Sequence, residues 1–538
     1  MKTNLPKLIS ILLAGMAFLS AQNLAPAKFL LKETETAVTT GSAGLRSNAI
    51  SEVRLQGSRA VWLGTGRGLA VVRDSVTVES LDTLMLSDGS QIILNMGISA
   101  IAAAGDTLMV ASATDDGNIP VGGGLYYTAA VSDSLIVWTY YQQPIDDAGD
   151  TLAPFADRFF RALPVTTDRA NVTYDMSIAG NYVWITSWAG GLRRFDIASQ
   201  VWDRIPLPED DQDFLITCAD TSYESINGQS VLRNFYLNPR DPSDEGNHNH
   251  KAFSVLAYND TVWVGTANGI NRGILGPNGC IDWEHYSYPL SGLSGNFVVG
   301  LARQLWNGRR IIWAATLNAD DPTEKRGLSY TLDDGETWMS VLPGERIYNI
   351  ATVDSLVLAA SERGLWKSED GINWALFKPA RDATPFASDE ILSNKVFSVA
   401  LDTRPYYSQP VIWIGTQDGL ARSDDLFGSN WKIFRADYDP EEVYAYPNPF
   451  SPFSHNVLGD DGYVRIHTDV KQSYVIEMAI YNYAMERVYR TEFDRRKGAG
   501  TLKWNGRDDQ GRLVANGIYF IKLNYDMKTE WIKLVIVK

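Results

Sequence analysis

Cysteine and histidine are scarce in this chain: its 538 residues include two cysteines, Cys218 and Cys280, and five histidines. So few thiols exclude the cysteine clusters that hold structural zinc, and they allow at most one internal disulfide. In an oxidising compartment the two cysteines would join loops of neighbouring structural units. The sequence leaves this pairing open, because it does not show whether the two positions lie within bonding distance.

Positive charge is also in short supply, since 48 Lys and Arg stand against 64 Asp and Glu, for a formal net charge of −16. Nucleic acids and anionic membranes are bound through basic faces, so neither is expected as a partner. Long apolar runs are missing after residue 19. The mature chain is therefore expected to have no membrane-spanning segment.

The amino-terminal segment holds the one extended apolar run. Lys2 and Lys7 precede it, residues 8–19 form it, and the small residues Ser20 and Ala21 end it. A basic start, a short apolar core and small residues at the end are typical of a secretory signal peptide. We predict a signal peptide over residues 1–21 and a polar lead-in segment over residues 22–45.

A strand motif followed by a glycine-bearing turn recurs through residues 46–440. Its clearest copy reads Val-Ile-Trp-Ile-Gly-Thr at 411–416 and continues with Gly419 and Leu420. Seven copies are found, with central residues Trp62, Met109, Trp184, Trp263, Trp313, Leu358 and Trp413. They are spaced by roughly 45 to 80 residues, which is the repeat range of propellers and solenoids. Each copy has the alternation and turn residues of a β-hairpin.

Further apolar runs flank each copy, so each unit is expected to hold four short strands. The fold class is therefore all-β, and residues 46–440 are predicted to form a seven-bladed β-propeller, with six or eight blades as alternatives. We interpret the repeated tryptophan as a packing residue between blades. The small residues that follow it predict a close backbone approach near the central channel: Gly64, Gly265, Ala314, Ala359 and Gly415.

Two stretches between copies are unusually long, residues 140–172 and residues 208–250. Loops of this length in a compact fold are usually functional or mobile, so a ligand site is predicted on the face that they share. The second stretch contains His248 and His250, whose spacing would suit a metal. A solvated loop is the preferred interpretation, because the neighbouring residues are Asn, Gly and Asp and no third ligand is evident.

Two turns carry an aspartate-centred motif. The first extends from Thr331 to Trp338 and the second from Ser368 to Trp374. The aspartate accepts hydrogen bonds from its own turn, the glycine allows a left-handed backbone, and the tryptophan packs beneath. The motif resembles the Asp-box of sialidases, sortilin-type receptors and xyloglucan-hydrolysing propellers, which implies a structural role. Its residues are Thr331, Asp333, Gly335, Trp338, Ser368, Asp370, Gly371 and Trp374.

The sequence does not single out catalytic residues. Glycoside hydrolysis needs two facing carboxylates, and many acidic pairs qualify without any being selected. No phosphate-binding glycine loop, nucleophile elbow or zinc cluster is found. No cofactor is predicted; structural calcium at acidic turns such as Asp115-Asp116 and Asp320-Asp321 is an alternative that lacks the usual Asp-x-Asp-x-Asp-Gly loop.

The repeat as a whole resembles the propeller repeats of bacterial exported two-component regulators, above all from Trp413 to Asp424. Those sensors continue into a membrane helix and kinase modules, which have no counterpart in this sequence. The resemblance therefore implies the propeller fold and an extracytoplasmic location, and it does not imply signalling.

After residue 440 the repeats stop, and the sequence continues with Tyr-Pro-Asn-Pro-Phe at 446–450 and then with runs of alternating apolar and polar residues typical of strands. This pattern predicts a small C-terminal β-sandwich over residues 441–538. Its motifs resemble the immunoglobulin-like domain of flagellar hook-capping proteins and the C-terminal sorting domain of the type IX secretion system. That family usually has Asp where Asn505 stands. The matching residues are Tyr446, Pro447, Asn448, Pro449, Phe450, Trp504, Gly506, Asp508, Gly511, Gly517 and Tyr519.

These patterns predict a secreted or surface-exposed binding module of a Gram-negative-type bacterium. The resemblance of the C-terminal domain implies type IX secretion machinery as a partner, and an accessory sandwich without a sorting role is the alternative. The ligand of the propeller, a glycan, peptide or protein, is not specified by the sequence. The alternative function is a secreted propeller-type glycoside hydrolase or lyase.

Overall fold

The computed structural model describes residues 44–538 except 117–118, 133–134, 320, 378–379, 385–386, 392, 437–442, 456–461, 469–474, 495–501 and 526–527. The predicted signal peptide, nearly all of the lead-in segment and the boundary at residues 440–441 lie outside the described residues. Regular structure in the described part is β-strand, with short 3₁₀ turns η2 (Asp220–Ser222), η3 (Pro242–Asp244), η4 (His248–His250) and η5 (Pro277–Gly279). The expected all-β class is confirmed.

Seven antiparallel sheets, each containing four strands consecutive in the chain, hold most of the strands before residue 437 in the described part. The first four are β1 (Ile50–Gln56), β2 (Ala60–Thr65), β3 (Gly68–Val72) and β4 (Glu79–Leu81); β7 (Gly97–Ala104), β8 (Thr107–Asp116), β9 (Ile119–Thr128) and β10 (Val137–Tyr141); β13 (Asp175–Ala179), β14 (Tyr182–Ser187), β15 (Gly191–Asp196) and β16 (Val201–Arg204); β20 (Ala252–Tyr258), β21 (Thr261–Thr266), β22 (Gly269–Leu275) and β23 (Ile281–Tyr286).

The fifth to seventh sheets are β24 (Phe297–Trp306), β25 (Arg309–Leu317), β26 (Gly327–Thr331) and β27 (Met339–Val341); β28 (Ile347–Val353), β29 (Leu356–Ser361), β30 (Gly364–Ser368) and β31 (Ala375–Leu376); β34 (Val396–Asp402), β35 (Val411–Thr416), β36 (Gly419–Ser423) and β37 (Trp431–Phe434). A hairpin of β32 (Arg381–Thr384) and β33 (Ala387–Glu390) precedes the last of these sheets, and β5 (Thr83–Leu86) with β6 (Gln91–Ile93) extends the second sheet beyond β10.

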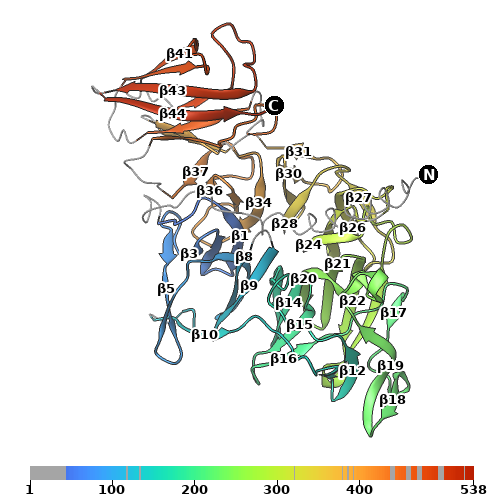
Figure 1. Ribbon diagram of the computed structural model, residues 1–538. Helices are drawn as coiled ribbons and strands as arrows, with labels where there is room; N and C mark the ends of the chain where they lie inside the picture. The colour runs from blue at the N-terminus through green and yellow to red at the C-terminus, as the bar shows by residue number, and fades with distance from the viewer. Residues whose placement is uncertain are drawn as a thin grey trace, which may run out of the picture.

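The first strand of each sheet contacts the first strand of the next sheet, in the order β1, β7, β13, β20, β24, β28, β34 and back to β1. The sheets are therefore arranged radially around the line where these strands meet (Figure 1). This arrangement is that of a β-propeller, in which neighbouring sheets cover one another's faces.

All copies of the sequence motif fall on the second strand of a sheet, so they are equivalent in the structure as well as in the sequence. The indole rings of Trp62, Trp184, Trp263, Trp313 and Trp413 are buried. In four of them Nε1 donates to a side chain at or near the end of the preceding strand: Gln56 at 2.7 Å, Tyr258 at 3.0 Å, Gln304 at 2.8 Å and Asp402 at 3.0 Å. The tryptophan thus packs between sheets and satisfies its one polar atom within its own sheet.

The small residues mark places where neighbouring sheets approach closely. A Cβ on Gly265 would lie 2.5 Å from the carbonyl oxygen of Val298, and one on Gly415 would lie 2.8 Å from that of Ile50. In the fifth and sixth sheets the prediction was wrong by one residue. By strand register the equivalents of these glycines are Ala315 and Ala360, and not Ala314 and Ala359.

The two long stretches form one accessory sheet and are not irregular loops. The first contributes β11 (Leu152–Phe155) and β12 (Arg158–Ala162), the second β18 (Tyr223–Ile226) and β19 (Gln229–Leu237), and β12 pairs in parallel with β19. Their apolar side chains, including Phe160 and Phe235, join a core that also contains Trp184 and Trp283. The stretches therefore bury apolar surface against the third and fourth sheets, and the ligand site predicted on them stays a prediction.

Cys218 and Cys280 form a disulfide, with their Cα atoms 5.3 Å apart. Cys218 follows β17 (Phe214–Leu215), which pairs with β23, and Cys280 lies in the turn between β22 and β23. The bond therefore fastens the second long stretch to the fourth sheet. We expected it to join neighbouring units, and it acts instead within one unit and its insertion.

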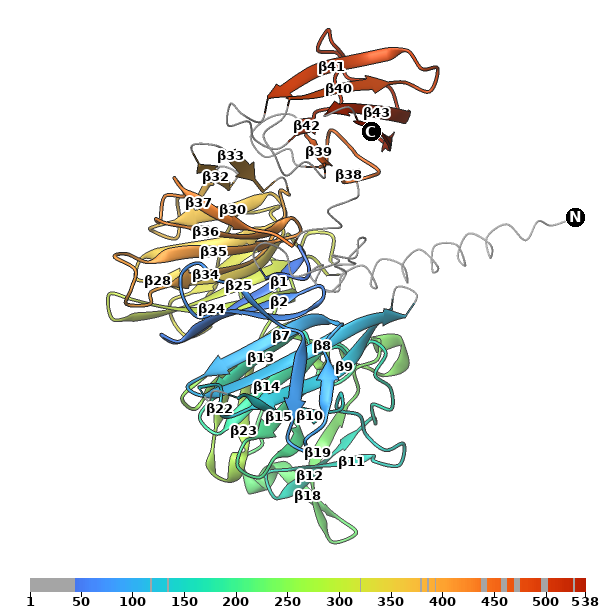
Figure 2. The same ribbon diagram turned by 90° about the vertical axis from the view of Figure 1, so that its left-hand side faces the viewer.

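The C-terminal residues form two further sheets with a core of their own. One contains β38 (Tyr444–Tyr446), β39 (Val464–His467) and β42 (Lys503–Trp504); the other contains β40 (Val475–Tyr481), β41 (Arg487–Asp494), β43 (Gly517–Tyr525) and β44 (Lys528–Ile536). Every member of that core lies between Val443 and Ile536. Figure 2 shows these sheets at one end of the molecule, beside the sixth and seventh sheets of the propeller.

Candidate ligand pocket

The first and last sheets of the ring are joined through a buried ion pair at the end of β34. Asp402 and Arg404 are both almost fully inaccessible to solvent, and Arg404 Nη2 lies 2.8 Å from Asp402 Oδ2. Arg404 Nε donates to both carboxylate oxygens, at 3.0 and 2.9 Å, and Trp413 Nε1 donates to Oδ2 at 3.0 Å. A buried charge pair is tolerated when all its polar atoms are satisfied, and this one meets that condition.

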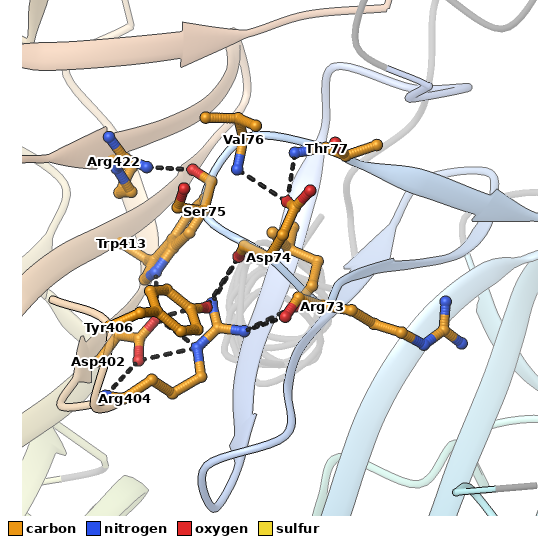
Figure 3. A network of polar contacts seen from close by, with 11 residues as sticks. Arg73, Asp74, Ser75, Val76, Thr77, Asp402, Arg404, Tyr406, Trp413 and Arg422 are labelled. Atoms are coloured by element: carbon orange, nitrogen blue, oxygen red, sulfur yellow. Dashed lines mark hydrogen bonds and ion pairs between the residues drawn. The ribbon is translucent and has the colours of Figure 1, made fainter.

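The remaining donors of Arg404 reach across to the first sheet. Nη1 donates to the carbonyl oxygens of Val72 and Arg73, at 3.1 and 3.2 Å, and Nη2 donates to that of Asp74 at 3.1 Å. Figure 3 shows the guanidinium pointing at this turn between β3 and β4. The last sheet therefore holds the first through main-chain carbonyls that are some 330 positions away along the chain.

A pocket of about 640 Å³ opens beside this contact, in the size range of small-molecule sites. One wall is the β3–β4 turn and the other is the loop between β34 and β35, together with the end of β36. The lining residues are Arg73, Asp74, Ser75, Tyr406, Tyr407, Ser408, Gln409, Val411, Arg422 and Asp424. We call this space the seam pocket, because it lies where the ring closes.

The aromatic and cationic groups of the seam pocket are held by their neighbours. Tyr406 donates its hydroxyl to the carbonyl of Asp74 at 2.9 Å, and its ring lies 4.9 Å from the Arg404 guanidinium. Arg422 donates to the carbonyl of Ser75 and, at 2.6 Å, to Asp424. Its guanidinium also lies 5.7 Å from the ring of Tyr407. The lining is therefore largely preformed, which reduces the entropy cost of binding.

Ionisation states in the seam pocket favour hydrogen bonding over acid–base chemistry. Burial raises the pKa of both Tyr406 and Tyr407, so their hydroxyls stay protonated. Partial burial alone would raise the pKa of Asp74, but the N–H groups of Thr77 and Val76 donate to its carboxylate and bring the pKa below its ordinary value. Asp74 is therefore ionised near neutral pH and is already an acceptor for its own turn.

A pair of carboxylates is found on the innermost strands. Arg54 Nη2 lies 2.9 Å from Glu52 and 3.6 Å from Asp175. Asp175 also accepts from the N–H groups of Met176 at 2.9 Å and Val255 at 3.0 Å. Both carboxylates bind Arg54, and that of Asp175 also accepts from one N–H group of its own strand and one of a neighbouring strand, which is a structural arrangement. It differs from the open pair that hydrolysis of a glycosidic bond requires.

The predicted Asp-box residues lie away from the seam pocket and link consecutive sheets. Asp333 accepts from Thr331 Oγ1 at 2.7 Å and from the Thr337 N–H at 3.0 Å, and Gly335 has φ +107°. The second motif repeats this pattern with Ser368, Asp370 and Gly371. Trp338, just before β27 of the fifth sheet, packs edge-on to Trp263 of the fourth sheet. Trp374, just before β31 of the sixth sheet, packs edge-on to Trp313 of the fifth.

The predicted sorting-motif residues lie within the C-terminal sheets. Phe450 is fully buried and exchanges main-chain hydrogen bonds with Val535 and Val537, and Asn448 donates to the carbonyl of Lys533 at 2.8 Å. Trp504 donates to the carbonyl of Arg507, and Tyr519 donates to that of Ala515. Asp508 accepts from two N–H groups of its turn, while Gly506, Gly511 and Gly517 have positive φ; Tyr446–Pro447 and Asn448–Pro449 are cis. In this structure these motif residues make contacts within the C-terminal sheets.

His250 is buried, and both its ring nitrogens are occupied. Nδ1 accepts from the Asn238 N–H at 2.9 Å and Nε2 lies 3.0 Å from the Leu207 carbonyl, so the ring is a neutral donor and acceptor within the fold. His248 lies 3.6 Å from Asp241. In the described part of the chain no group of three His, Cys, Asp or Glu side chains is placed to hold a metal. Of the acidic turns considered for calcium, Asp116 pairs with Arg169 at 3.0 Å, and Asp320 lies outside the described residues.

Sequence reasoning did not predict the seam pocket; it predicted a ligand site on the two insertions, and that stays a prediction. The signal available was weak: an Arg-Pro-Tyr-Tyr run at 404–407 in the longest first-to-second-strand connection of the ring. No local sequence pattern links these residues to the β3–β4 turn, because the two segments come into contact only when the last sheet packs against the first. In the described residues, no helix is long and apolar enough to cross a membrane.

No protein-family model matches the sequence, and comparison with curated proteins gives no match. Several solved structures are similar. PorZ, described as an essential bacterial surface component of the type IX secretion system of Porphyromonas gingivalis, has 14% identity, a TM-score of 0.26, and coverage of 92% of this chain and 76% of its own.

The extracellular domain of a hybrid two-component system from B. thetaiotaomicron has 10% identity, a TM-score of 0.28 and coverage of 92% and 81%. An ancestral GH74 enzyme has 13% identity, a TM-score of 0.27 and coverage of 90% and 64%. With TM-scores this low, none of these structures assigns a ligand or a site residue to this chain. What stands is an all-β chain whose propeller carries a polar pocket at the junction of its first and last sheets.

Proposed function

We propose that this protein is an exported bacterial surface module that binds a glycan in the seam pocket. In this proposal the seven sheets are the blades of one closed seven-bladed propeller, and residues 441–538 are an immunoglobulin-like sorting or anchoring domain. The supporting observation is the preformed pocket of about 640 Å³ between the first and last sheets, beside the Arg404–Asp402 pair that joins them.

The chemistry of the lining favours a neutral, hydroxyl-rich ligand. Its ionisable side chains, apart from the two tyrosines, are two arginines and two aspartates, so their formal charges cancel. Tyrosine, serine and glutamine side chains supply both donors and acceptors, and the Tyr406 ring, 49% exposed, offers an apolar face. Sugars present hydroxyl edges and apolar C–H faces, which match these two kinds of group.

A glycan array followed by calorimetry on the intact protein tests this proposal. We expect neutral glycans to bind, and Tyr406→Ala to weaken binding by at least about tenfold, because it removes the exposed ring of the pocket. Tyr483→Ala, at an exposed tyrosine of the C-terminal sheets, is the matched control and should bind normally. Equal binding by both variants, or no neutral glycan bound by the wild type, would count against the seam pocket.

The sorting role of residues 441–538 rests on the motif resemblance and on the independent core of these sheets. A periplasmic reporter fused to this segment should reach the cell surface in a host with a type IX system, and the reporter alone should stay in the periplasm. A fusion that also stays in the periplasm would leave an accessory sandwich as the better description.

A glycoside hydrolase or lyase is the second candidate. A hydrolase would need an open carboxylate pair, and the pair at Glu52 and Asp175 is bridged by Arg54. A hydrolysis screen on the glycans that bind distinguishes the two: product formation that is lost in Glu52→Gln would replace the binding module by an enzyme.

A further inference from the structure

We propose that the ligand site continues past Arg73 into a second cavity, so that the ligand is a linear oligosaccharide of several units and not a single sugar. This inference rests on the proposed function, because it takes the seam pocket as the primary site.

The second cavity lies between the first two sheets and has a volume of about 740 Å³. One side is formed by Arg59 and Ala60 of the first sheet, and the other by β5 and the residues just before β10. The lining residues are Arg59, Ala60, Arg73, Glu79, Leu81, Thr83, Met85, Val131, Ser132, Leu135, Ile136 and Trp138. We call this space the side groove.

Arg73 is the residue that the two spaces share. Its carbonyl belongs to the turn that Arg404 holds, whereas its guanidinium pairs with Glu79 in the side groove. Figure 3 shows the Arg73 side chain extending away from Arg404 and out of the network. The side chain is 43% exposed, so a chain passing from one space to the other would run along it.

The two spaces complement each other chemically. The seam pocket presents hydroxyl, amide and guanidinium groups, while the side groove has the apolar side chains of Leu81, Met85 and Leu135 with Thr83 at its edge. A pyranose chain alternates polar edges with apolar faces, so successive units would find partners in both. Over the two spaces together the formal charges cancel, because three arginines (Arg59, Arg73, Arg422) stand against three carboxylates (Asp74, Glu79, Asp424).

Size gives an independent reason for a longer ligand. Each space alone falls within the range of about 300–1,000 Å³ that holds one small ligand. A single sugar would occupy part of the seam pocket and leave the side groove unused. In a linear chain that fills both spaces, the units in the seam pocket hold the following units close to the side groove. Their effective concentration there is high, so the affinity of the whole chain rises.

The test measures the affinity of the full-length protein for neutral oligosaccharides of one to six units. One series has the linkage of the neutral glycans that bind on the array, and the other consists of gluco-oligosaccharides. For the wild type we expect affinity to rise at least about tenfold between the shortest and the longest chains. Thr83→Trp places a bulky ring in the side groove at an exposed position and should abolish this rise while leaving the shortest binding chain unaffected.

Leu135→Asp, at a position 61% exposed, is a second variant in case Thr83→Trp does not fold, and Leu290→Asp, 89% exposed and lining neither space, is the control. Affinity that is independent of length, or a rise that survives both side-groove variants, would overturn the extension while Tyr406→Ala still reports on the primary site. If no neutral chain of any length binds the wild type, the proposed function and this inference fail together.

Discussion

At the scale of single residues, His250 is the buried group whose titration most affects the fold. Burial lowers its pKa to about 4, because the charged ring would lose its hydration inside the protein. In the unfolded chain the pKa returns to about 6.5. Keeping this ring neutral therefore lowers the free energy of unfolding only at acidic pH.

The sign of the resulting pH dependence follows directly. Below pH 6.5 the unfolded chain binds a proton that the folded chain refuses, so the free energy of unfolding falls by up to about 1.4 kcal/mol per pH unit, for a total of about 3 kcal/mol near pH 4. Urea unfolding of the wild type and of His250→Gln between pH 7.5 and 4.5 checks this. The glutamine variant should be less stable at neutral pH and should show a shallower loss in acid; parallel curves would contradict the assignment.

The Asp402–Arg404 pair yields a second prediction at this scale. Arg404→Met leaves the Asp402 carboxylate buried, with Trp413 and a main-chain N–H as its remaining partners. It also removes the hydrogen-bond donor of the first-sheet carbonyls. Loss of one member of a buried pair typically costs about 3–5 kcal/mol. The double variant Asp402→Asn/Arg404→Met removes the stranded charge and should recover part of that loss. Denaturant titrations measure both, and a cost below about 1 kcal/mol for Arg404→Met would show that the pair does not stabilise ring closure.

At the scale of elements, the accessory sheet depends on contacts between two segments far apart in the chain. The disulfide Cys218–Cys280, which spans 62 positions, ties the second of these segments to the fourth sheet. Replacing both cysteines by serine should lower the free energy of unfolding by about 2–4 kcal/mol, since the unfolded chain is then less constrained.

Limited proteolysis locates that effect. In the serine variant, and in the wild type under reducing conditions, cleavage should begin in residues 208–250 before the rest of the ring is cut. The oxidised wild type is the control. Cleavage that starts elsewhere in the reduced protein would mean that the disulfide does not hold the insertion.

Sequence patterns gave correct positions for elements that repeat or alternate. The motif copies all lie on second strands because burial on both faces demands β-branched and aromatic residues there. The C-terminal strands, such as β43, alternate buried and half-buried residues and were equally visible. The accessory sheet was missed because the parallel pairing of β12 with β19 joins short strands across more than sixty positions, and no local pattern encodes such a pairing.

At the scale of the whole molecule, a polar contact joins the C-terminal sheets to the propeller. Asp418, in the turn between β35 and β36, accepts from Arg465 at 2.9 Å and from Arg435 of the propeller side at 3.0 Å. The core of the C-terminal sheets includes no residue of the ring. The two parts therefore have separate stabilising contacts.

Removal of residues 441–538 should accordingly leave a folded propeller. Because Asp418 keeps Arg435 as a partner, we expect the Tm of the ring to shift by no more than about 4 °C. Calorimetry of the full chain should show a second transition that disappears in the truncated protein, and Arg465→Ala serves as the control that removes only the contact. Loss of the ring transition on truncation would show that the parts fold as one.

Sequence and structure diverge most for the site. The patterns predicted an all-β chain and pointed to a separate C-terminal unit, and they placed a ligand site on the insertions, which stays a prediction; they gave no sign of the seam pocket. The seam pocket depends on Arg404 and on carbonyl groups of residues 72–74, and carbonyls carry no sequence signal. A pocket assembled from the two ends of a ring is therefore invisible until the ring is built.

The contact of Arg404 with Val72 also has a consequence for biosynthesis. The partners are separated by 332 positions, so a ribosome adding about 5–20 residues per second needs roughly 20–60 s between making the first and the last of them. Throughout that interval the apolar face of the first sheet that packs against the last sheet has no neighbour. An export route that keeps the nascent polypeptide extended until translocation is complete would spare the cell this period of exposed apolar surface.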